Sequence, residues 1–193
     1  AGFYYKTFMW PKFFWEKIYE PIIRSSAGLG NLSGKADPSC YDKGFLHCDL
    51  LIIGGGPSGL NAALNASKTK LKTILIDDDF LLGGRLNSDN YEINGMTGKE
   101  WAKNCIDEIK RSKNVRILSR TTVYGSFDHG IYGALERKTD HLFSDNNKPR
   151  QILWKIYSKR SILCAGSSER SIAFGNNDRP GVMLSGSINS YIN

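Results

Sequence analysis

Residue types that hold metals or form disulfides are scarce in this sequence. Only four cysteines and three histidines occur among its 193 residues. They are Cys40, Cys48, Cys105, Cys164, His47, His129 and His141. No cysteine pair has CxxC spacing, and no two histidines have the spacing of a zinc site. We therefore expect no metal site and no disulfide framework, and unpaired thiols favour a reducing, cytoplasmic compartment.

Long apolar runs are also missing. The longest run beside the glycine-rich turn at residues 54–59 covers only a few positions, whereas a membrane span needs roughly 18–20. The first residues are aromatic, but charged side chains interrupt them and no small-residue cleavage site follows, so we expect no signal peptide. A Ser/His/Asp or Cys/His nucleophile set is absent too. We therefore predict no membrane partner and no catalytic residue on this chain.

The net charge of +7 is concentrated in one stretch. Six basic side chains and one acidic side chain lie between residues 148 and 170, while the rest of the chain is close to neutral. Alternating charges on a β-prone stretch are typical of a solvated strand face. A protein partner or an anionic cofactor is the alternative. Nucleic acid is disfavoured, because the surplus is local rather than spread over a binding surface.

A strand, a glycine turn and a helix follow one another at residues 50–69. The apolar run at residues 50–53 is typical of a buried parallel strand. It leads directly into Gly-Gly-Gly-Pro-Ser-Gly at residues 54–59, and apolar residues at helical spacing predict a helix over 58–69. A second apolar strand, residues 73–76, ends at Asp77. This order is the context that turns a glycine motif into a dinucleotide-binding prediction.

Each position of the turn has a physical task. Gly54 permits the tight turn, Gly56 lets a pyrophosphate approach the backbone, and Gly59 lets the helix pack closely on the strand. The helix start at Pro57 and Ser58 offers free N–H groups and a positive dipole end to phosphates. A turn kept only for packing is the alternative interpretation.

An acidic run follows the second strand. Asp77 stands where an acid accepts hydrogen bonds from the adenosine ribose. Asp78 and Asp79 come directly after it, and three carboxylates would repel a ribose 2′-phosphate. We therefore predict that NADP is disfavoured. NAD and FAD both present the free hydroxyl, so this unit does not separate them.

Two further glycine positions are candidate cofactor contacts. Gly84 and Arg85 lie in the loop after the second strand and offer either a turn or a second approach to a phosphate. Ala165 and Gly166 stand at the tip of the last apolar strand. Since ligands of parallel sheets bind at the carboxyl ends of strands, we expect this pair to lie near the cofactor.

The remaining pattern predicts a layered α/β fold. Thr97 and Glu100 form a capping box before a helix that Asn114 ends, with Trp101 and Cys105 on its buried stripe. Further segments predict a strand at 115–118, a β-meander over 121–127, 132–138 and 151–159, and a final strand at 161–166. We expect a Rossmann-like, three-layer dinucleotide-binding domain with a parallel sheet and this meander.

The chain is expected to divide after residue 45. Residues 1–45 form an irregular aromatic arm and a glycine-rich linker, and residues 46–193 form the nucleotide-binding domain. This segment, an arm or a short helix, would pack against the rest of a larger protein, with a membrane anchor or a binding surface as alternatives. The absence of an initiator methionine and the new element near residue 192 indicate a truncated domain.

Several segments resemble the α subunit of heterotetrameric sarcosine oxidase. They are residues 2–11, 47–49, 120–125, 128–130, 133–137 and 176–183. The resemblance implies oxidation of sarcosine to glycine, with hydrogen peroxide and formaldehyde or methylene-tetrahydrofolate as further products. It implies NAD on this chain, FAD mainly on the β subunit, FMN between α and β, and tetrahydrofolate in a carboxyl-terminal α domain. The implied partners are the β, γ and δ subunits.

The resemblance also assigns residues. Gly54, Gly56, Pro57, Ser58 and Gly59 match the phosphate turn of the family. In addition, Asp77 matches the ribose acid, and Val123 falls where strand backbone contacts adenine. Arg85 stands where we expect a small residue. Under this resemblance, residues 1–45 are the tail of a preceding domain.

Two other interpretations stay open. The first is an FAD-binding subunit of a related amine, opine or glycine dehydrogenase. The second is a non-catalytic assembly module with a vestigial nucleotide site.

Overall fold

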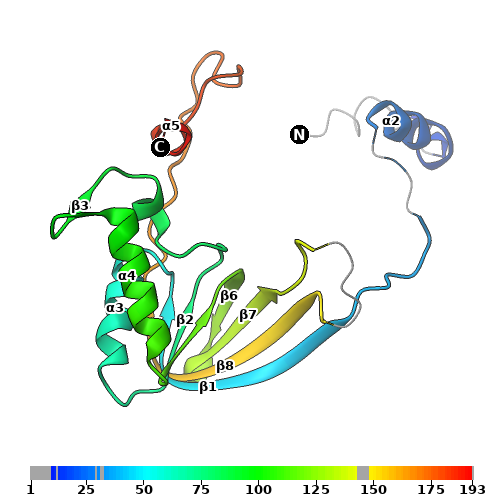
Figure 1. Ribbon diagram of the computed structural model, residues 1–193. Helices are drawn as coiled ribbons and strands as arrows, with labels where there is room; N and C mark the ends of the chain where they lie inside the picture. Colours follow the sequence, from blue (N-terminus) through cyan, green and yellow to red (C-terminus); the bar gives the residue numbers. More distant parts are fainter. Residues whose placement is uncertain (1–9, 12, 29, 31–32, 143–147, 193) are drawn as a thin grey trace. The chain divides into compact units, whose positions relative to one another are not determined.

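Two separate units make up the chain in the computed structural model, Ala1–Pro38 and Ser39–Asn193 (Figure 1). The structure describes residues 10–11, 13–28, 30, 33–142 and 148–192. The aromatic residues at positions 3–8, and residues 143–147 between the predicted strands 132–138 and 151–159, lie outside the described residues.

The described part of the smaller unit contains the short helix that was one of the two forms expected there. A π-helical turn, η1 (Trp15–Tyr19), runs into α2 (Glu20–Ser26). A proline in the first turn of α2 suits a helix start, because its missing N–H has no helical partner there. Arg24 Nε lies 2.6 Å from Glu20 Oε1 one turn away. The arm is therefore helical over residues 15–26.

The boundary expected after residue 45 lies inside a strand. β1 (Tyr41–Ile53) begins five residues earlier, because its first part pairs in parallel with β8 (Gln151–Leu163) from Tyr41 opposite Gln151 onward. Residues 41–45 had no apolar run to mark them, since three of their side chains are polar or absent and most face solvent. The larger unit therefore starts at Ser39.

A six-stranded sheet forms the centre of the larger unit, in the order β5-β2-β1-β8-β7-β6. β5 (Val115–Leu118), β2 (Thr73–Ile76), β1 and β8 are parallel. β7 (Ile131–Arg137) and β6 (Thr121–Phe127) continue the sheet in antiparallel pairing. All four residues of β2 are buried, as expected for a central parallel strand covered on both faces.

Two helices cover one face of the parallel strands. Figure 1 shows α3 (Pro57–Ser67) and α4 (Gly98–Arg111) side by side on this face. Their buried stripes meet the sheet through Leu60, Ala63 and Ile109. The predicted capping box is present, with Glu100 N donating to Thr97 Oγ1 at 3.2 Å and Thr97 N to Glu100 Oε2 at 3.0 Å. The predicted helix and its start are confirmed.

The carboxyl end of α4 differs from the prediction. The helix ends at Arg111, three residues before Asn114. The Asn114 side-chain amide instead donates to the carbonyl oxygens of Ala66, Thr69 and Leu71, each at 3.0 Å. Asn114 therefore ties the loop between α3 and β2 to the start of β5.

The meander strands β6, β7 and β8 belong to the same sheet and help to bury the face of β1 and β2 that α3 and α4 leave uncovered. Leu51, Ile74 and Ile156 belong to a second buried cluster, against which Val123 and Trp154 pack. The predicted α/β fold with a parallel sheet and a β-meander is thus confirmed. The strands expected separately at 151–159 and 161–166 are one strand, because β8 pairs with β7 in its first half and with β1 along its whole length.

Short elements complete the larger unit. They are η2 (Gly84–Asn87), β3 (Glu92–Ile93), β4 (Met96–Thr97), η3 (Asp128–Gly130) and α5 (Ser185–Ile192). No helix in the described part of the chain combines the length and the apolar character that crossing a bilayer requires.

Candidate functional site

A cavity of about 660 Å³ opens at the carboxyl ends of β1, β2 and β8. Its lining comes from residues 53–54, 56–58, 76–79, 84–85, 121–123 and 163–167. Eleven of the twelve cofactor residues predicted from the sequence are in this lining, and Gly59 alone is not. Segments more than 100 residues apart thus meet where parallel sheets bind ligands.

The glycine turn is fixed by backbone packing at two of its positions. Gly54 has φ of 105°, and a Cβ there would lie 2.3 Å from the Cys164 carbonyl oxygen. A Cβ at Gly59 would lie 1.8 Å from the Gly54 carbonyl oxygen. Neither position therefore admits a side chain. Gly59 is buried beneath the cavity and acts by letting α3 approach β1.

Gly56 is different, because it faces open space. It is the N-cap of α3, with φ of −70° and ψ of −171°, and a Cβ built there meets no atom within 4 Å. No side chain forms a capping hydrogen bond at this helix end, which begins with Pro57. The N–H groups of the first turn and the positive end of the helix dipole are therefore available to an anion in the cavity.

The Asp77 carboxylate supports the turn from the end of β2. It accepts hydrogen bonds from the N–H groups of Gly55 and, at 2.8 Å, of Asp79. A carboxylate has about four lone-pair sites, so the same group retains capacity for a ribose hydroxyl. The sequence pattern did not reveal this second role, which fixes the position of the glycine turn relative to β2.

The acidic run lies at the side of the cavity formed by β6. Asp78 and Asp79 join Asp77 in the lining, together with Thr122 and Val123 of β6. Arg137 Nη2 donates to the Asp78 carbonyl oxygen at 2.5 Å, and the Arg120 guanidinium lies 5.2 Å from the centre of the Phe80 ring. These cations hold the backbone after β2.

Gly83 and Gly84, in the loop after β2, pack against Gly55 and Gly56 of the glycine turn. Gly83 N donates to the Gly55 carbonyl oxygen at 2.9 Å, and a Cβ at Gly84 would lie 3.2 Å from Gly56 Cα. Both Gly83 and Gly84 have positive φ, of 123° and 52°. The loop therefore brings Arg85 to the cavity, beside the start of α3.

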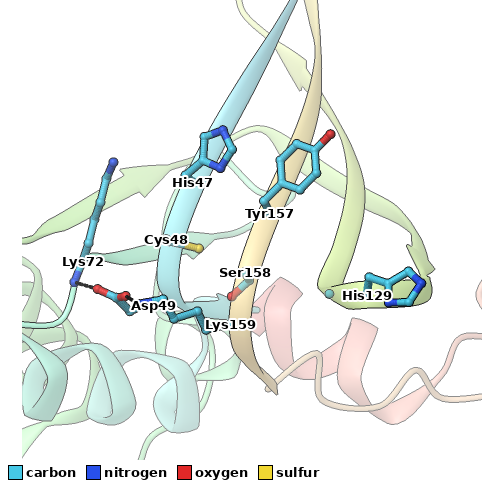
Figure 2. Close-up of a pocket in the computed structure, with 9 residues that line it drawn as sticks. His47, Cys48, Asp49, Lys72, His129, Tyr157, Ser158 and Lys159 are labelled. Atoms are coloured by element: carbon cyan, nitrogen blue, oxygen red, sulfur yellow. Dashed lines mark hydrogen bonds and ion pairs between the residues drawn. The ribbon is translucent and has the colours of Figure 1, made fainter.

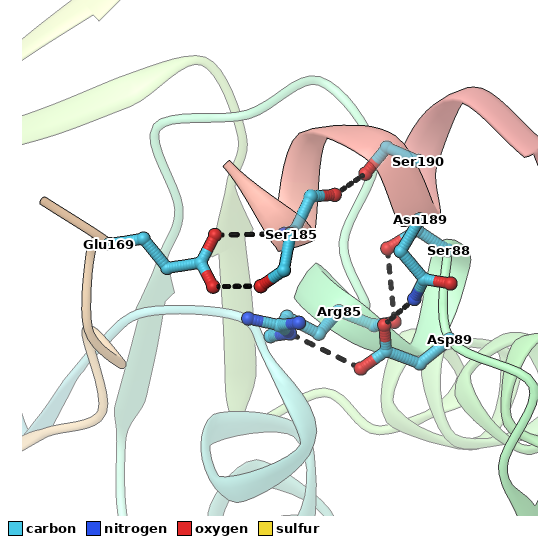
Figure 3. Close-up of polar contacts among 8 residues, drawn as sticks. Arg85, Ser88, Asp89, Glu169, Ser185, Asn189 and Ser190 are labelled. Carbon is cyan, nitrogen blue, oxygen red and sulfur yellow. Dashed lines mark hydrogen bonds and ion pairs between the residues drawn. The ribbon is translucent and has the colours of Figure 1, made fainter. Parts of the chain in front are cut away.

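The Arg85 guanidinium lies near two carboxylates, those of Asp89 and Glu169. Figure 3 shows its guanidinium between Asp89 and Glu169, with Nε 3.2 Å from Asp89 Oδ2. The bond to Asp89, and then the nearby Glu169 charge, raise the pKa of Arg85 above its ordinary value. Its side chain is more than half exposed, so it remains free to turn toward an anion in the cavity.

The end of β8 forms the remaining wall. Cys164 N donates to the Ile53 carbonyl oxygen at 2.7 Å, which aligns the tips of β8 and β1. Ala165 and Gly166 follow, and Gly166 has φ of 66°. Burial raises the pKa of the Cys164 thiol, so this cavity residue is protonated at neutral pH.

A second, open concavity of about 590 Å³ lies away from the glycine turn (Figure 2). His47 and Tyr157 stack there with ring centroids 4.8 Å apart, and His129 lies on the same lining. Asp49 Oδ1 lies 2.7 Å from Lys159 Nζ, and this bond, followed by the Lys72 N–H, lowers the pKa of Asp49. No pattern in the sequence indicates that these segments meet.

The basic stretch of β8 has partners within the fold. Lys159 pairs with Asp49, and Arg150 Nε lies 2.5 Å from Asp140 Oδ1. Lys155 Nζ lies 5.4 Å from the centre of the Tyr157 ring. Within the described ranges, no group of three or more histidine, cysteine, aspartate or glutamate residues is arranged to hold a metal ion.

Comparison with known proteins agrees with this architecture. The profile of the family described as FAD dependent oxidoreductase matches residues 49–111, from β1 through α4. The chain also resembles L-proline dehydrogenase from P. horikoshii in structure, with a TM-score of 0.57 and 25% identity over 76% of this chain and 27% of that one.

Two relatives carry the same name. Sarcosine oxidase subunit alpha of Rhizobium meliloti (strain 1021) is 47% identical over all of this chain and 20% of its own length. That of Corynebacterium sp. (strain U-96) is 38% identical over 86% of this chain and 18% of its own length. The chain thus spans about a fifth of the length of these relatives, and the resemblance seen in its sequence is confirmed.

Proposed function

We propose that this chain, a segment of the sarcosine oxidase α-subunit family, binds the ADP part of an adenine dinucleotide in the cavity beside the glycine turn. One observation carries the proposal. Gly56 caps α3 without a side chain, faces open space and leaves the first-turn N–H groups exposed to the cavity. Such a helix start favours a pyrophosphate.

The lining residues have distinct roles in this proposal. The N–H groups of Gly56 and Ser58 hold the pyrophosphate at the start of α3, where Pro57 lines the cavity beside it, and Arg85 adds a positive charge. Asp77 accepts from the ribose. Gly54 and Gly59 keep the turn and helix in place, because neither admits a Cβ.

The other lining residues are assigned to the adenosine and to the second nucleotide. Val123 and Asp78 line the adenosine side, and Ala165 and Gly166 line the side where the second nucleotide would leave the phosphates. The three acids after β2 would repel a 2′-phosphate. NADP is therefore the dinucleotide that this cavity rejects.

NAD is our first candidate for the occupant, because the family resemblance implies it on this segment. FAD is the second, and the match of residues 49–111 to FAD dependent oxidoreductases favours it. When bound, either dinucleotide supplies a ring that accepts or donates a hydride. The chain's own residues bind and orient that group, and we assign none of them to proton transfer.

In the whole protein we propose a role in oxidising sarcosine to glycine, with hydrogen peroxide and formaldehyde or methylene-tetrahydrofolate as the other products. The partners would be β, γ and δ subunits, and FAD, FMN and tetrahydrofolate would complete the cofactor set. A cytoplasmic location stays a prediction. The rest of the α subunit and these partners would supply the amine-oxidising site.

Calorimetric titration of the chain with NAD, FAD and NADP tests the binding proposal. We expect NAD or FAD to bind, and NADP to bind at least tenfold more weakly than NAD. Arg85→Gln should weaken binding of the preferred dinucleotide, since it removes one charged contact with the phosphates. A folded chain that binds neither NAD nor FAD would contradict the proposal.

A further inference from the structure

The chain after β8 returns to Arg85, a residue that lines the dinucleotide cavity. We name residues 167–192 the strap. Its first residue, Ser167, belongs to the cavity lining, and its last element is α5. A Cβ at Gly186, in the first turn of α5, would lie 3.7 Å from Arg85 Nη1. The strap therefore begins in the cavity lining and ends, at α5, beside Arg85 of the same lining.

Polar contacts, rather than apolar packing, hold α5 in this place. None of its eight described residues is buried. Glu169 accepts from Ser185 Oγ at 2.6 Å and from Gly186 N at 2.8 Å, so its carboxylate lies at the N-terminus of α5 (Figure 3). One turn later, Asn189 Nδ2 donates to Asp89 Oδ1 at 2.5 Å.

These contacts converge on Arg85. Asp89, which binds Asn189 through one oxygen, lies 3.2 Å from Arg85 Nε through the other. Glu169 is the second anion beside the same guanidinium. The Ser185 hydroxyl and the Gly186 N–H, followed by the Arg85 charge, lower the pKa of Glu169, so it is ionised at neutral pH.

We propose that Glu169 is a positioning residue that fastens the strap across the dinucleotide cavity and thereby slows release of the bound cofactor. The inference rests on the function proposed above. Glu169 touches no cofactor in this account. It acts through α5 and Arg85, which it holds at the cavity mouth. Exposed ionic contacts are individually weak, so the strap can open when a dinucleotide binds or leaves.

The charges of Arg85, Asp89 and Glu169 explain why the contacts that hold α5 respond to a bound cofactor. Without phosphates, Arg85 is shared between Asp89 and Glu169. A pyrophosphate at the start of α3 offers the guanidinium a stronger anionic partner in the same cavity. Arg85 then bridges the cofactor and the acids that hold α5. Binding at the glycine turn therefore stabilises the closed strap.

The test uses Glu169→Gln, which keeps the size of the side chain but removes its charge. FAD and NAD are each loaded in turn, and release is followed after adding excess unlabelled competitor. Losing a charge-assisted hydrogen bond at an exposed position should speed release about fivefold. Asn189→Ala, which breaks the second contact of α5, should act in the same direction.

Asp178→Asn is the matched control, because it removes one carboxylate from the same strap at an exposed position outside the contacts of α5. Its release rate should equal that of the wild type. The unfolding midpoint should be the same for Glu169→Gln and the control, which separates the effect from a general loss of stability.

Hydrogen exchange distinguishes failure of this inference from failure of the proposed function. Added dinucleotide should slow exchange both in the first turn of α3 and in α5 of the wild type, and only in α3 of Glu169→Gln. Protection in α3 with no change in α5, or an unchanged release rate in Glu169→Gln, would overturn the strap inference alone. No protection in α3 and no binding would overturn the dinucleotide site, and the strap inference with it.

Discussion

Replacing Gly56 by alanine separates binding from folding in this protein. The new methyl group meets no protein atom within 4 Å, and the backbone there, with φ of −70°, suits alanine. It would project toward the cavity from the N-cap of α3. The change therefore leaves the packing of the chain intact and occupies space that we assign to a phosphate.

Two opposing terms keep the effect on stability small. Alanine restricts the unfolded chain and gains about 0.4–1 kcal/mol at a compatible position. Alanine is also a poorer N-cap than glycine, which costs a similar amount. We expect the free energy of unfolding to change by less than about 1 kcal/mol.

The effect on binding should be much larger. Each hydrogen bond between a backbone N–H and a charged phosphate contributes about 1.5–3 kcal/mol. Loss of one such bond corresponds to a roughly 10- to 150-fold rise in Kd. Calorimetry with the dinucleotide that the wild type binds measures this rise, and urea unfolding measures stability on the same samples.

Gly175→Ala provides the matched control. This glycine also has no atom within 4 Å of a built Cβ, but it is not part of the cavity lining. Its substitution should change neither binding nor stability. Unchanged affinity in Gly56→Ala would show that no phosphate approaches this backbone, and the assignment of the helix start as the phosphate site would be refuted.

Three further predictions concern the fold. Gly59→Ala should destabilise the chain by about 3 kcal/mol or more in urea unfolding, because its Cβ would lie 1.8 Å from the Gly54 carbonyl oxygen; a change below 1 kcal/mol would contradict this packing. Thr97→Ala should cost about 1 kcal/mol through loss of the capping box, measured in the same way, and no loss would mean that the cap does not stabilise α4. Hydrogen bonds lower the pKa of Asp140, chiefly from Gln151 and then from Arg150, so this carboxyl stabilises the fold above its unfolded pKa. Its contribution should be lost as pH falls below about 3.8, and urea unfolding that shows rising stability on acidification would contradict the sign.

The glycine turn and its neighbours were predictable because their signals are local. The strand at 50–53, the turn at 54–59 and the strand at 73–76 each show their pattern within a few residues. Their arrangement is the one common to dinucleotide-binding domains. The capping box of α4 is equally local. Eleven predicted residues therefore meet at one cavity.

The departures have non-local causes. Two strands were expected, 151–159 and 161–166, with a break at Arg160 inside a run of polar residues. Pairing with β1 carries β8 through this run as one strand. Arg85 and Asn189 meet through Asp89 although about 100 residues separate them, and no sequence period marks such a contact. The hydrogen bond from the Gly55 N–H to the Asp77 carboxylate could not be predicted either, because it depends on the geometry of the folded turn.

A crystal structure of the chain with a bound dinucleotide tests the central claim most directly. Our account predicts the pyrophosphate against the backbone of Gly56 and Ser58 at the start of α3, with a ribose beside Asp77. Density for the dinucleotide in the concavity of His47 and Tyr157, with the space before α3 empty, would contradict it.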